Sequence, residues 1–168
     1  MLAGKNRTKI SKELLSLAGE FAVASELCRR GIYAQLTLGL RKRTDLLVET
    51  DTAMLRIQVK AKQINKWTCK GIFGENIMLV LVDYENKTLD KRPDFYVLTP
   101  SDWESFVRWW LSDEISEGKV VLNNENCPIW ASSKGGKPYE GTDVLPGDIT
   151  EHKERWDKVE ILMKRGAA

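Results

Sequence analysis

Residues 44–62, TDLLVETDTAMLRIQVKAK, decide the fold of this chain. Residues 45–49 contain an apolar run, and a tight polar turn follows at 50–52. Within the expected strand 54–62, apolar and polar side chains alternate strictly from residue 55, so that Ile57 and Val59 point one way while Gln58 and Lys60 point the other. The stretch predicts two strands joined by a turn, the second with one face on a core and one polar face.

The segments on either side supply the rest of an α/β or α+β fold. Apolar residues recur at spacings of three and four over residues 9–30, which predicts a helix with one apolar stripe. Further strands are expected at 32–37, 77–84 and 95–98, and further helices at 99–115 and 150–164. Residues 118–147, rich in Gly, Pro, Asn and Ser, are expected to form a long irregular surface segment. We therefore expect one domain, 1–168, in which helices flank a mixed five-stranded sheet.

The composition is typical of an ordinary globular domain and excludes several classes of protein. With 168 residues, 42% hydrophobic and 30% charged, the chain needs no disulfide or metal to hold a core. No apolar run reaches the ~20 residues of a membrane span, and no signal peptide is recognisable. Three widely spaced cysteines, Cys28, Cys69 and Cys127, form neither a disulfide framework nor a zinc pattern. We expect a cytoplasmic protein without membrane contact.

The net charge of +2 hides an asymmetry between the two parts of the chain. Residues 1–70 hold 14 Lys and Arg against 6 Asp and Glu, a balance of +8, and residues 71–168 hold 12 against 18, a balance of −6. A basic first half suggests a polyanionic partner such as a nucleic acid. An unevenly patterned solvated surface explains the same numbers, so the asymmetry alone does not decide between the two.

Four polar residues occur in an order that is typical of a catalytic site. Glu20 lies on the predicted first helix, Asp45 begins a strand, and Gln58 and Lys60 share one face of the next strand. Asp45 and the Gln-x-Lys run resemble the two halves of the motif of the PD-(D/E)XK nuclease superfamily. Glu20 resembles the helix-one acid of the Holliday-junction-resolvase-like branch of that superfamily. The resemblance is strongest over residues 17–62 and implies a restriction-endonuclease-like core.

The resemblance also implies a metal-dependent site for phosphodiester cleavage. Oxygen ligands hold Mg²⁺ in such a site, and we expect Mn²⁺ to substitute for it. The ligands here would be Asp45, the amide oxygen of Gln58, the carbonyl of Val59 and, through water, Glu20. Lys60 would orient the attacking water or neutralise the charge that develops on the phosphate.

Each of these residues also has a plain structural interpretation. Asp45 resembles many acids at strand ends, and Lys60 belongs to an alternation that any one-sided sheet shows. Glu20 could pair with a base on its own helix. Gln58 departs from the acid of the superfamily motif, and a neutral amide holds a cation less strongly than a carboxylate, which leaves catalytic activity open.

Basic residues surround the predicted site. Arg41, Lys42 and Arg43 precede the first acid of the motif, and Lys62 and Lys66 follow the motif strand. Such residues contact the phosphates of DNA, although ordinary solvated loops have the same composition. Five tryptophans are expected in the core or in an interface rather than against bases, namely Trp103, Trp109, Trp110, Trp130 and Trp156.

Three functional hypotheses follow from the sequence. The first is a Mg²⁺-dependent endonuclease that acts on duplex or branched DNA in restriction, homing or junction resolution. The second is a nuclease-like fold that has lost catalysis and serves as a DNA-binding or assembly module. The third is an unrelated α/β protein in which the motif is accidental. For the first, a homodimer is the simplest expectation, because cutting both strands of a duplex requires two sites.

Overall fold

The computed structural model describes residues 9–38, 43–49, 54–132 and 136–165 of the chain. Its helices are α1 (Lys12–Arg29), α2 (Pro100–Trp110), α3 (Ser112–Ser116), the 3₁₀ helix η1 (Pro146–His152) and α4 (Asp157–Arg165). Its strands are β1 (Ala34–Leu36), β2 (Leu46–Glu49), β3 (Met54–Lys62), β4 (Trp67–Cys69), β5 (Ile77–Asp83), β6 (Asp94–Leu98), β7 (Val120–Leu122), β8 (Pro128–Trp130), β9 (Tyr139–Glu140) and β10 (Thr142–Val144). Within these ranges, no helix combines the length and the apolar character that crossing a membrane requires.

Five strands form the main sheet in the order β1-β2-β3-β5-β6. The β3–β5 pair is parallel, and the other three pairs are antiparallel. All seven residues of β5 are buried, as expected for an apolar strand inside a sheet. The predicted mixed five-stranded sheet with flanking helices is therefore confirmed.

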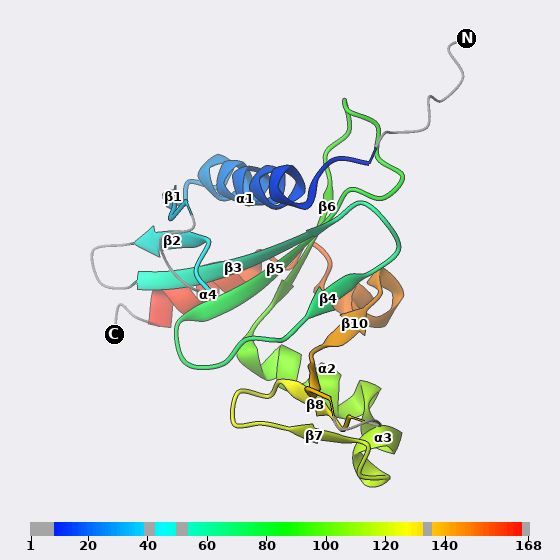
Figure 1. Ribbon diagram of the computed structural model, residues 1–168. Coiled ribbons are helices and arrows are strands. Elements are labelled where there is room, and N and C mark those ends of the chain that lie inside the picture. The colour runs from blue at the N-terminus through cyan, green and yellow to red at the C-terminus, as the bar shows by residue number, and fades with distance from the viewer. Residues whose placement is uncertain (1–8, 39–42, 50–53, 133–135, 166–168) are drawn as a thin grey trace.

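Helices cover both faces of this sheet and create two cores. On one face α1 and α4 pack against alternate residues of β2, β3 and β5, in a cluster that includes Val23, Leu27, Ile57 and Val80. On the other face α2 and η1 pack around Trp103, which is fully buried. Figure 1 shows α1 and α2 on opposite sides of the sheet. The polar residues of β3 that belong to the predicted site lie on the face of the strand opposite the α1 core.

Helix α1 approaches the sheet unusually closely at one residue. The helix begins at Ser11, whose side chain accepts a hydrogen bond from Leu14 N, and it ends before Gly31, which has a φ of +76°. Gly19 is buried at its midpoint, and a Cβ atom placed there would lie 2.8 Å from Cβ of Ala61 on β3. Glycine at this position therefore sets the distance between α1 and β3.

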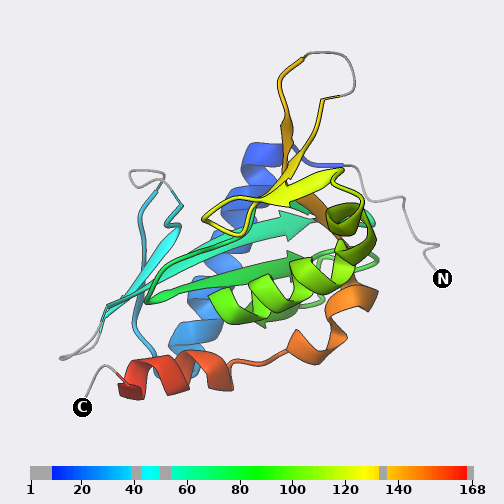
Figure 2. The same cartoon turned by 90° about the horizontal axis from the view of Figure 1, so that it is seen from below.

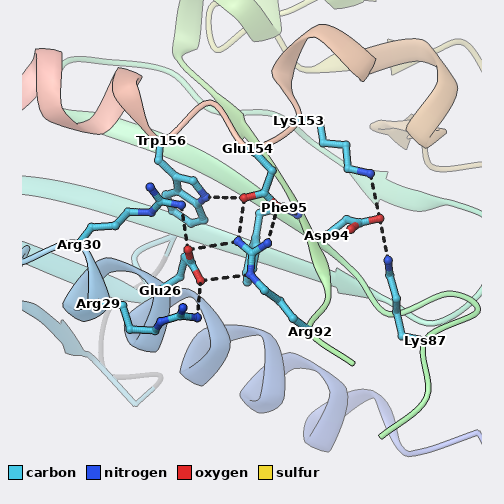
Figure 3. Close-up of polar contacts among 10 residues, drawn as sticks. All are labelled: Glu26, Arg29, Arg30, Lys87, Arg92, Asp94, Phe95, Lys153, Glu154 and Trp156. Atoms are coloured by element: carbon cyan, nitrogen blue, oxygen red, sulfur yellow. Dashed lines mark hydrogen bonds and ion pairs between the residues drawn. The ribbon is translucent and has the colours of Figure 1, made fainter. Parts of the chain in front are cut away.

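A network of charged side chains ties α1 to the segment before α4 (Figure 3). Glu26, only 7% exposed, accepts hydrogen bonds from Arg30 at 2.8 Å and from Arg92 at 3.2 Å. Arg92 also donates to Glu154 at 2.7 Å, and the Trp156 ring nitrogen donates to the same carboxylate at 3.0 Å. The network connects three segments that are far apart in the sequence on the α1 side of the sheet.

Residues 118–147 differ from their prediction as an irregular segment. They contain β7, β8 and β9, which form a three-stranded antiparallel sheet, and β10, which pairs with β4. Figure 2 shows this segment, yellow to orange, lying outside the main sheet. Each strand has only two or three residues, so no alternation can develop in the sequence.

Three other elements depart from the predicted boundaries. Strand β4 was not predicted, and the helix expected over 99–115 is divided into α2 and α3 at Leu111, which has a φ of −108° and is buried. The helix expected over 150–164 begins only at Asp157, because residues 146–152 form η1. Leu111, between α2 and α3, and Ile149, inside η1, are both buried in the α2-side core and both have non-helical backbone angles.

The tryptophans divide between the core and the surface. Trp103 and Trp156 are fully buried, as expected, and Trp130 is half-buried. Trp109 is 63% exposed and Trp110 is 38% exposed, so neither is a core residue, and their place in an interface stays a prediction. They lie at the C-terminal end of α2, where the Trp110 ring stacks on the buried ring of Phe106 and the Trp109 ring is tilted against both.

Candidate active site

Strand β3 has a free edge where β2 begins. The β2–β3 ladder reaches only as far as the Leu46–Ile57 pair, and no strand in the described part of the chain pairs with this side of β3 beyond it. Asp45, the residue before β2, donates its N–H to the Ile57 carbonyl at 2.9 Å. Its Oδ2 atom accepts the Val59 N–H at 2.7 Å. The carboxylate of Asp45 therefore takes the place of a backbone carbonyl and is held against the edge of β3.

The carbonyl of Val59 points toward the same edge. Arg56 donates its N–H to Asn76 at 2.8 Å, on the side of β5. Because peptide groups alternate between the two sides of a strand, those of residues 57, 59 and 61 face away from β5. The Val59 carbonyl and the Asp45 carboxylate are thus two oxygen donors that share one edge.

Gln58 supplies a third oxygen next to Asp45. Its neighbours Ile57 and Val59 enter the α1 core, so the Gln58 side chain lies on the opposite face of β3. The antiparallel register places Gln58 beside Asp45, because Leu46 is opposite Ile57. Its Oε1 atom is buried and accepts no hydrogen bond from any described residue. A buried acceptor without a donor costs about 1–3 kcal/mol, which a cation beside it would offset.

Glu20 and Lys60 bring opposite charges to this edge. Glu20 follows Gly19, whose close contact with β3 carries the helix to the site, and Ser16 donates a hydrogen bond to its Oε1 at 3.3 Å. The charges of Asp45 and Lys60 both act on Glu20. Lys60 is exposed and makes no ion pair or hydrogen bond within the ranges that the structure describes. Its ammonium group is therefore available to a ligand.

The two acids at this edge are both harder to ionise than usual. Burial raises the pKa of Asp45, although the Val59 N–H and the charge of Lys60 act in the other direction. Burial, followed by the charge of Asp45, raises the pKa of Glu20. Two such carboxyl groups favour the approach of positive charge, because it relieves both the desolvation and the mutual repulsion.

The donor set at this edge fits a hard divalent cation. Among the described residues no three His, Cys, Asp or Glu side chains lie together as a metal cluster. A Mg²⁺ ion needs only one or two carboxylates, however, and completes its shell with neutral oxygens and water. Asp45, Gln58, the Val59 carbonyl and Glu20 supply that combination, and the orphaned Gln58 oxygen is the part of it that internal hydrogen bonding does not explain.

The prediction that Lys62 contacts DNA is wrong. Lys62 is 2% exposed and forms ion pairs with Asp83 at 2.8 Å and Glu85 at 2.7 Å. Its ammonium group also lies 4.9 Å from the centre of the Trp67 ring. Lys62 is the last residue of β3, and Trp67 of the α2-side core lies against it. Alternation correctly predicted the face of the strand on which Lys62 lies, but it did not predict that Lys62 is buried.

The other predicted DNA contacts remain exposed or lie outside the described residues. Lys66 and Arg43 are exposed, and each is paired with a carboxylate, Lys66 with Asp143 at 2.6 Å and Arg43 with Glu125 at 2.6 Å. Positions 41 and 42, also predicted to contact phosphates, lie outside the described residues. Sequence reasoning missed the two acidic partners because they lie 77 and 82 residues away along the chain.

A separate hollow lies between α2 and η1 and is lined by none of the predicted site residues. It has a volume of about 470 Å³ and is lined by residues of α2 and η1, among them Asp102, Trp109 and His152. Lys158 connects two of the lining residues, because its ammonium group lies 2.7 Å from Asp102 and 2.8 Å from the ring nitrogen Nδ1 of His152.

Comparison with known proteins finds similarity at the level of the fold. No family model matches the chain, and no curated protein matches it. Among solved structures, the fold is similar to that of the bacterial homing endonuclease I-Ssp6803I, with a TM-score of 0.48 and 16% sequence identity. The alignment covers 94% of this chain and 97% of that chain. The similarity is one of overall arrangement and does not extend to named residues.

Proposed function

We propose that this chain is a Mg²⁺-dependent endonuclease that hydrolyses phosphodiester bonds of DNA at the free edge of β3. The observation that carries the proposal is the buried Gln58 Oε1 atom, which no described residue satisfies and which lies beside the Asp45 carboxylate. The exposed Lys60 on the same strand supports it, because that ammonium group has no hydrogen-bond or ion-pair partner among the residues that the structure describes.

The residues at the edge divide the work between charge and geometry. Asp45 is fixed by the Val59 N–H through one oxygen, which leaves the other free to bind a cation. Gln58 and the Val59 carbonyl add neutral oxygens, and Glu20 would act through water. Bound Mg²⁺, or Mn²⁺ in its place, would supply the Lewis acid that stabilises an anionic phosphoryl transition state. Lys60 would hold a phosphate oxygen or orient the attacking water.

DNA would approach across the surface that carries the basic residues Arg43 and Lys66, with Arg41 and Lys42 as further expected contacts. Phosphate contacts of this kind make the affinity depend on salt, by about 0.9 in the log–log slope for each contact on duplex DNA. Both duplex and branched DNA are compatible with contacts to phosphates alone, because such contacts carry no sequence information.

A nicking assay tests the proposal. The purified protein is incubated with supercoiled plasmid in Mg²⁺, in Mn²⁺ and in chelator, and we expect nicking with either metal and none with chelator. Asp45→Asn should abolish nicking because it removes the charge that holds the metal, while DNA binding should persist or strengthen. Lys60→Ala should also abolish nicking, because the water and the developing charge lose their partner, although the metal can still bind.

Two exposed residues of similar type provide the controls. Asp113→Asn and Lys119→Ala make the same two substitutions at exposed positions away from the β3 edge, so they should leave nicking unchanged. Sustained cutting by Asp45→Asn in a preparation free of other nucleases would place the chemistry elsewhere in the chain.

Gln58 favours one alternative function, a nuclease fold that binds DNA or other partners without cutting. Under this alternative the wild type does not cut, and Gln58→Glu restores some cleavage by adding the carboxylate that the superfamily motif contains. Under the proposed function the wild type cuts, and Gln58→Glu tightens Mg²⁺ binding and keeps or raises activity. The wild type and this one variant therefore separate the two functions.

The proposed function includes a homodimer, because cleavage of both strands of a duplex requires two sites of this kind. Light scattering on the protein with and without a short duplex measures the stoichiometry directly. A single copy per duplex would limit the activity to nicking of one strand.

A further inference from the structure

Three exposed basic residues near the candidate site are each held by a carboxylate from the segment 118–147. We refer to the bases as the basic strip and to their partners as the acidic set. The pairs are Arg43–Glu125 at 2.6 Å, Lys66–Asp143 at 2.6 Å and Lys70–Glu140 at 2.7 Å. The partners are separated by 70 to 82 residues along the chain. In every pair the base comes from the basic first half of the sequence and the acid from the acidic second half.

Two of these pairs lie on one face of the β4–β10 ladder. The first and last residues of β4 are buried and its middle residue is exposed, so Lys66, Thr68 and Lys70 share the outward face. Asp143 is opposite Thr68 in the register. One Asp143 oxygen accepts the Thr68 hydroxyl at 2.9 Å, and the other accepts Lys66. The acid is thus aligned with the lysines by backbone pairing rather than by chance contact of long side chains.

Electrostatic coupling joins Arg43 to this face. The hydrogen bond and charge of Lys70, and then the charge of Arg43, hold the pKa of Glu140 below its usual value. Arg43 also stacks over the ring of Phe73, with 5.3 Å from its guanidinium carbon to the ring centre. The guanidinium is therefore positioned on both sides, by an aromatic ring and by carboxylates, at one end of the basic strip.

The basic strip is also continuous with the candidate active site. Burial raises the pKa of the Cys69 thiol to about 12, and the charges of Lys60 and Asp143 both act on that thiol in opposite directions. Lys60 of the site and Asp143 of the acidic set therefore both lie within electrostatic range of this β4 residue. At the other end, Arg43 is separated from Asp45 by a single residue.

We propose that the basic strip is a DNA-backbone-binding surface beside the active site, and that the acidic set occupies it as internal counterions in the free protein. The proposal rests on the proposed function and adds its regulation. A DNA phosphate must displace a carboxylate at each base. Every contact therefore costs the free energy of one internal ion pair, which lowers the affinity of encounters that use only one base. Contact at several positions together gives a net gain, since each phosphate then also releases its condensed cations.

The exposure of the pairs makes this exchange feasible. Each partner is at least about a third exposed, and exposed ion pairs are weak, so each contributes roughly 1.4- to 5-fold to an equilibrium. Three such pairs would together lower the affinity for DNA by roughly 3- to 100-fold. The same factor applies to any DNA duplex, because contacts with phosphates carry no sequence information.

Neutralising the acidic set tests the proposal. We compare the wild type with Glu125→Gln/Glu140→Gln/Asp143→Asn by fluorescence anisotropy, using a labelled DNA duplex in chelator at about 50 mM salt, where binding is measured without cleavage. The triple variant should bind roughly 3- to 100-fold more tightly. Its log–log salt slope should also be steeper, by up to about 0.9 for each base released. Adding Lys66→Gln and Lys70→Gln to the triple variant should cancel most of the gain.

A matched triple variant controls for net charge. Glu104→Gln/Glu117→Gln/Asp157→Asn also removes three acids and also frees three bases, Arg108, Lys119 and Arg155. Equal tightening in the two triple variants would overturn the proposal, because net charge alone would then explain it. Absence of binding by the wild type and both variants would overturn this inference and the proposed function together. If the wild type nicks DNA no better than Asp45→Asn, while the Glu125→Gln/Glu140→Gln/Asp143→Asn variant still binds DNA more tightly than the matched triple variant, only the proposed catalysis would be overturned.

Discussion

The carboxyl group of Asp45 lies at a position where burial opposes its ionisation. Because burial raises its pKa above the ordinary value of 3.8, the native state binds the proton more tightly than the unfolded chain does. The free energy of unfolding therefore falls as the pH rises from about 4 through the raised native pKa. Without divalent metal, Asp45→Asn should raise the Tm at pH 7, and the difference from wild type should close below about pH 4. A set of thermal melts between pH 3.5 and 7.5 measures both.

The same carboxylate should make stability depend on metal. At ten times its Kd, Mg²⁺ stabilises the native state by about 1.4 kcal/mol, which for a domain of this size raises the Tm by roughly 3–5 °C. Asp45→Asn should lose this response, whereas Asp113→Asn should keep it. A Tm of the wild type that is the same in 10 mM Mg²⁺, 10 mM Mn²⁺ and chelator would count against the donor set at the β3 edge.

Individual residues show where sequence reasoning reaches its limit. Strict alternation correctly put Gln58, Lys60 and Lys62 on one face of β3, because the period of a strand is fixed by its geometry. Alternation says nothing about what covers that face, and so Lys62 was mistaken for a surface residue. The unsatisfied oxygen of Gln58 was equally invisible, since the neutral amide reads in the sequence only as a departure from an acidic motif.

At the scale of elements, one glycine sets how α1 meets the sheet. A Cβ at position 19 would lie 2.8 Å from Cβ of Ala61, a contact that neither side chain can avoid by rotating. Gly19→Ala should therefore destabilise the protein by about 1–3 kcal/mol, although alanine is the better helix former by about 1 kcal/mol. Urea unfolding measures the loss, and nicking should fall with it, because the helix carries Glu20 away from β3.

A compensating change separates close packing from helix propensity. In Gly19→Ala/Ala61→Gly the methyl group moves from the strand to the helix, so most of the stability and activity should return. If the double variant is as unstable as the sum of the single variants, the two positions do not share a contact. That result would remove the explanation for how Glu20 reaches the site.

The longer elements were predictable, and the shortest ones, apart from β1, were not. Eighteen residues of α1 and nine of β3 are enough to display a period, and both were predicted. Strands β4, β7, β8, β9 and β10 contain two or three residues each, and β4 pairs with a strand that lies more than seventy residues further along. Pairing at such a distance depends on tertiary contacts, which local sequence does not encode.

At the scale of the whole molecule, the Glu26 network joins segments that local structure does not connect. Burial works to raise the pKa of Glu26, but the hydrogen bonds and charges of Arg92 and Arg30 outweigh it and leave the pKa lowered. Arg92→Met should lower the free energy of unfolding by about 1–2 kcal/mol, or roughly 3–6 °C in Tm, less than for a fully buried pair because Arg92 is partly exposed.

The pH dependence of this variant should oppose that of Asp45→Asn. A lowered native pKa contributes stability above the unfolded pKa, near 4.5, and this contribution is lost as the pH falls through the native value. Arg92→Met should therefore differ most from wild type near neutral pH and converge with it in acid. Arg108→Met, which breaks an exposed pair with Glu104, should change stability by less than about 0.5 kcal/mol.

The charge asymmetry of the sequence was correctly seen but only half understood. A basic first half suggested a polyanionic partner outside the protein, and in the free protein four of its bases pair with carboxylates of the second half. Net charge is additive along a sequence, whereas its neutralisation depends on which segments fold together. The five-stranded sheet, in contrast, followed from patterns inside single strands and was predicted correctly.

The placement of Trp156 has a consequence for how the protein is made. Trp156 and Val159 complete the core that α1 and β3 share, yet they are synthesised about a hundred residues after Lys60. At ~5–20 residues per second, the ribosome needs roughly 5–20 s to travel that distance. During that interval the nascent chain already displays its basic half and its apolar helix, with neither the carboxylates nor the tryptophan that will cover them. For those seconds the emerging polypeptide carries a net positive charge and exposes apolar surface. The core that α1 and β3 share can be completed only after the acidic half has left the ribosomal tunnel.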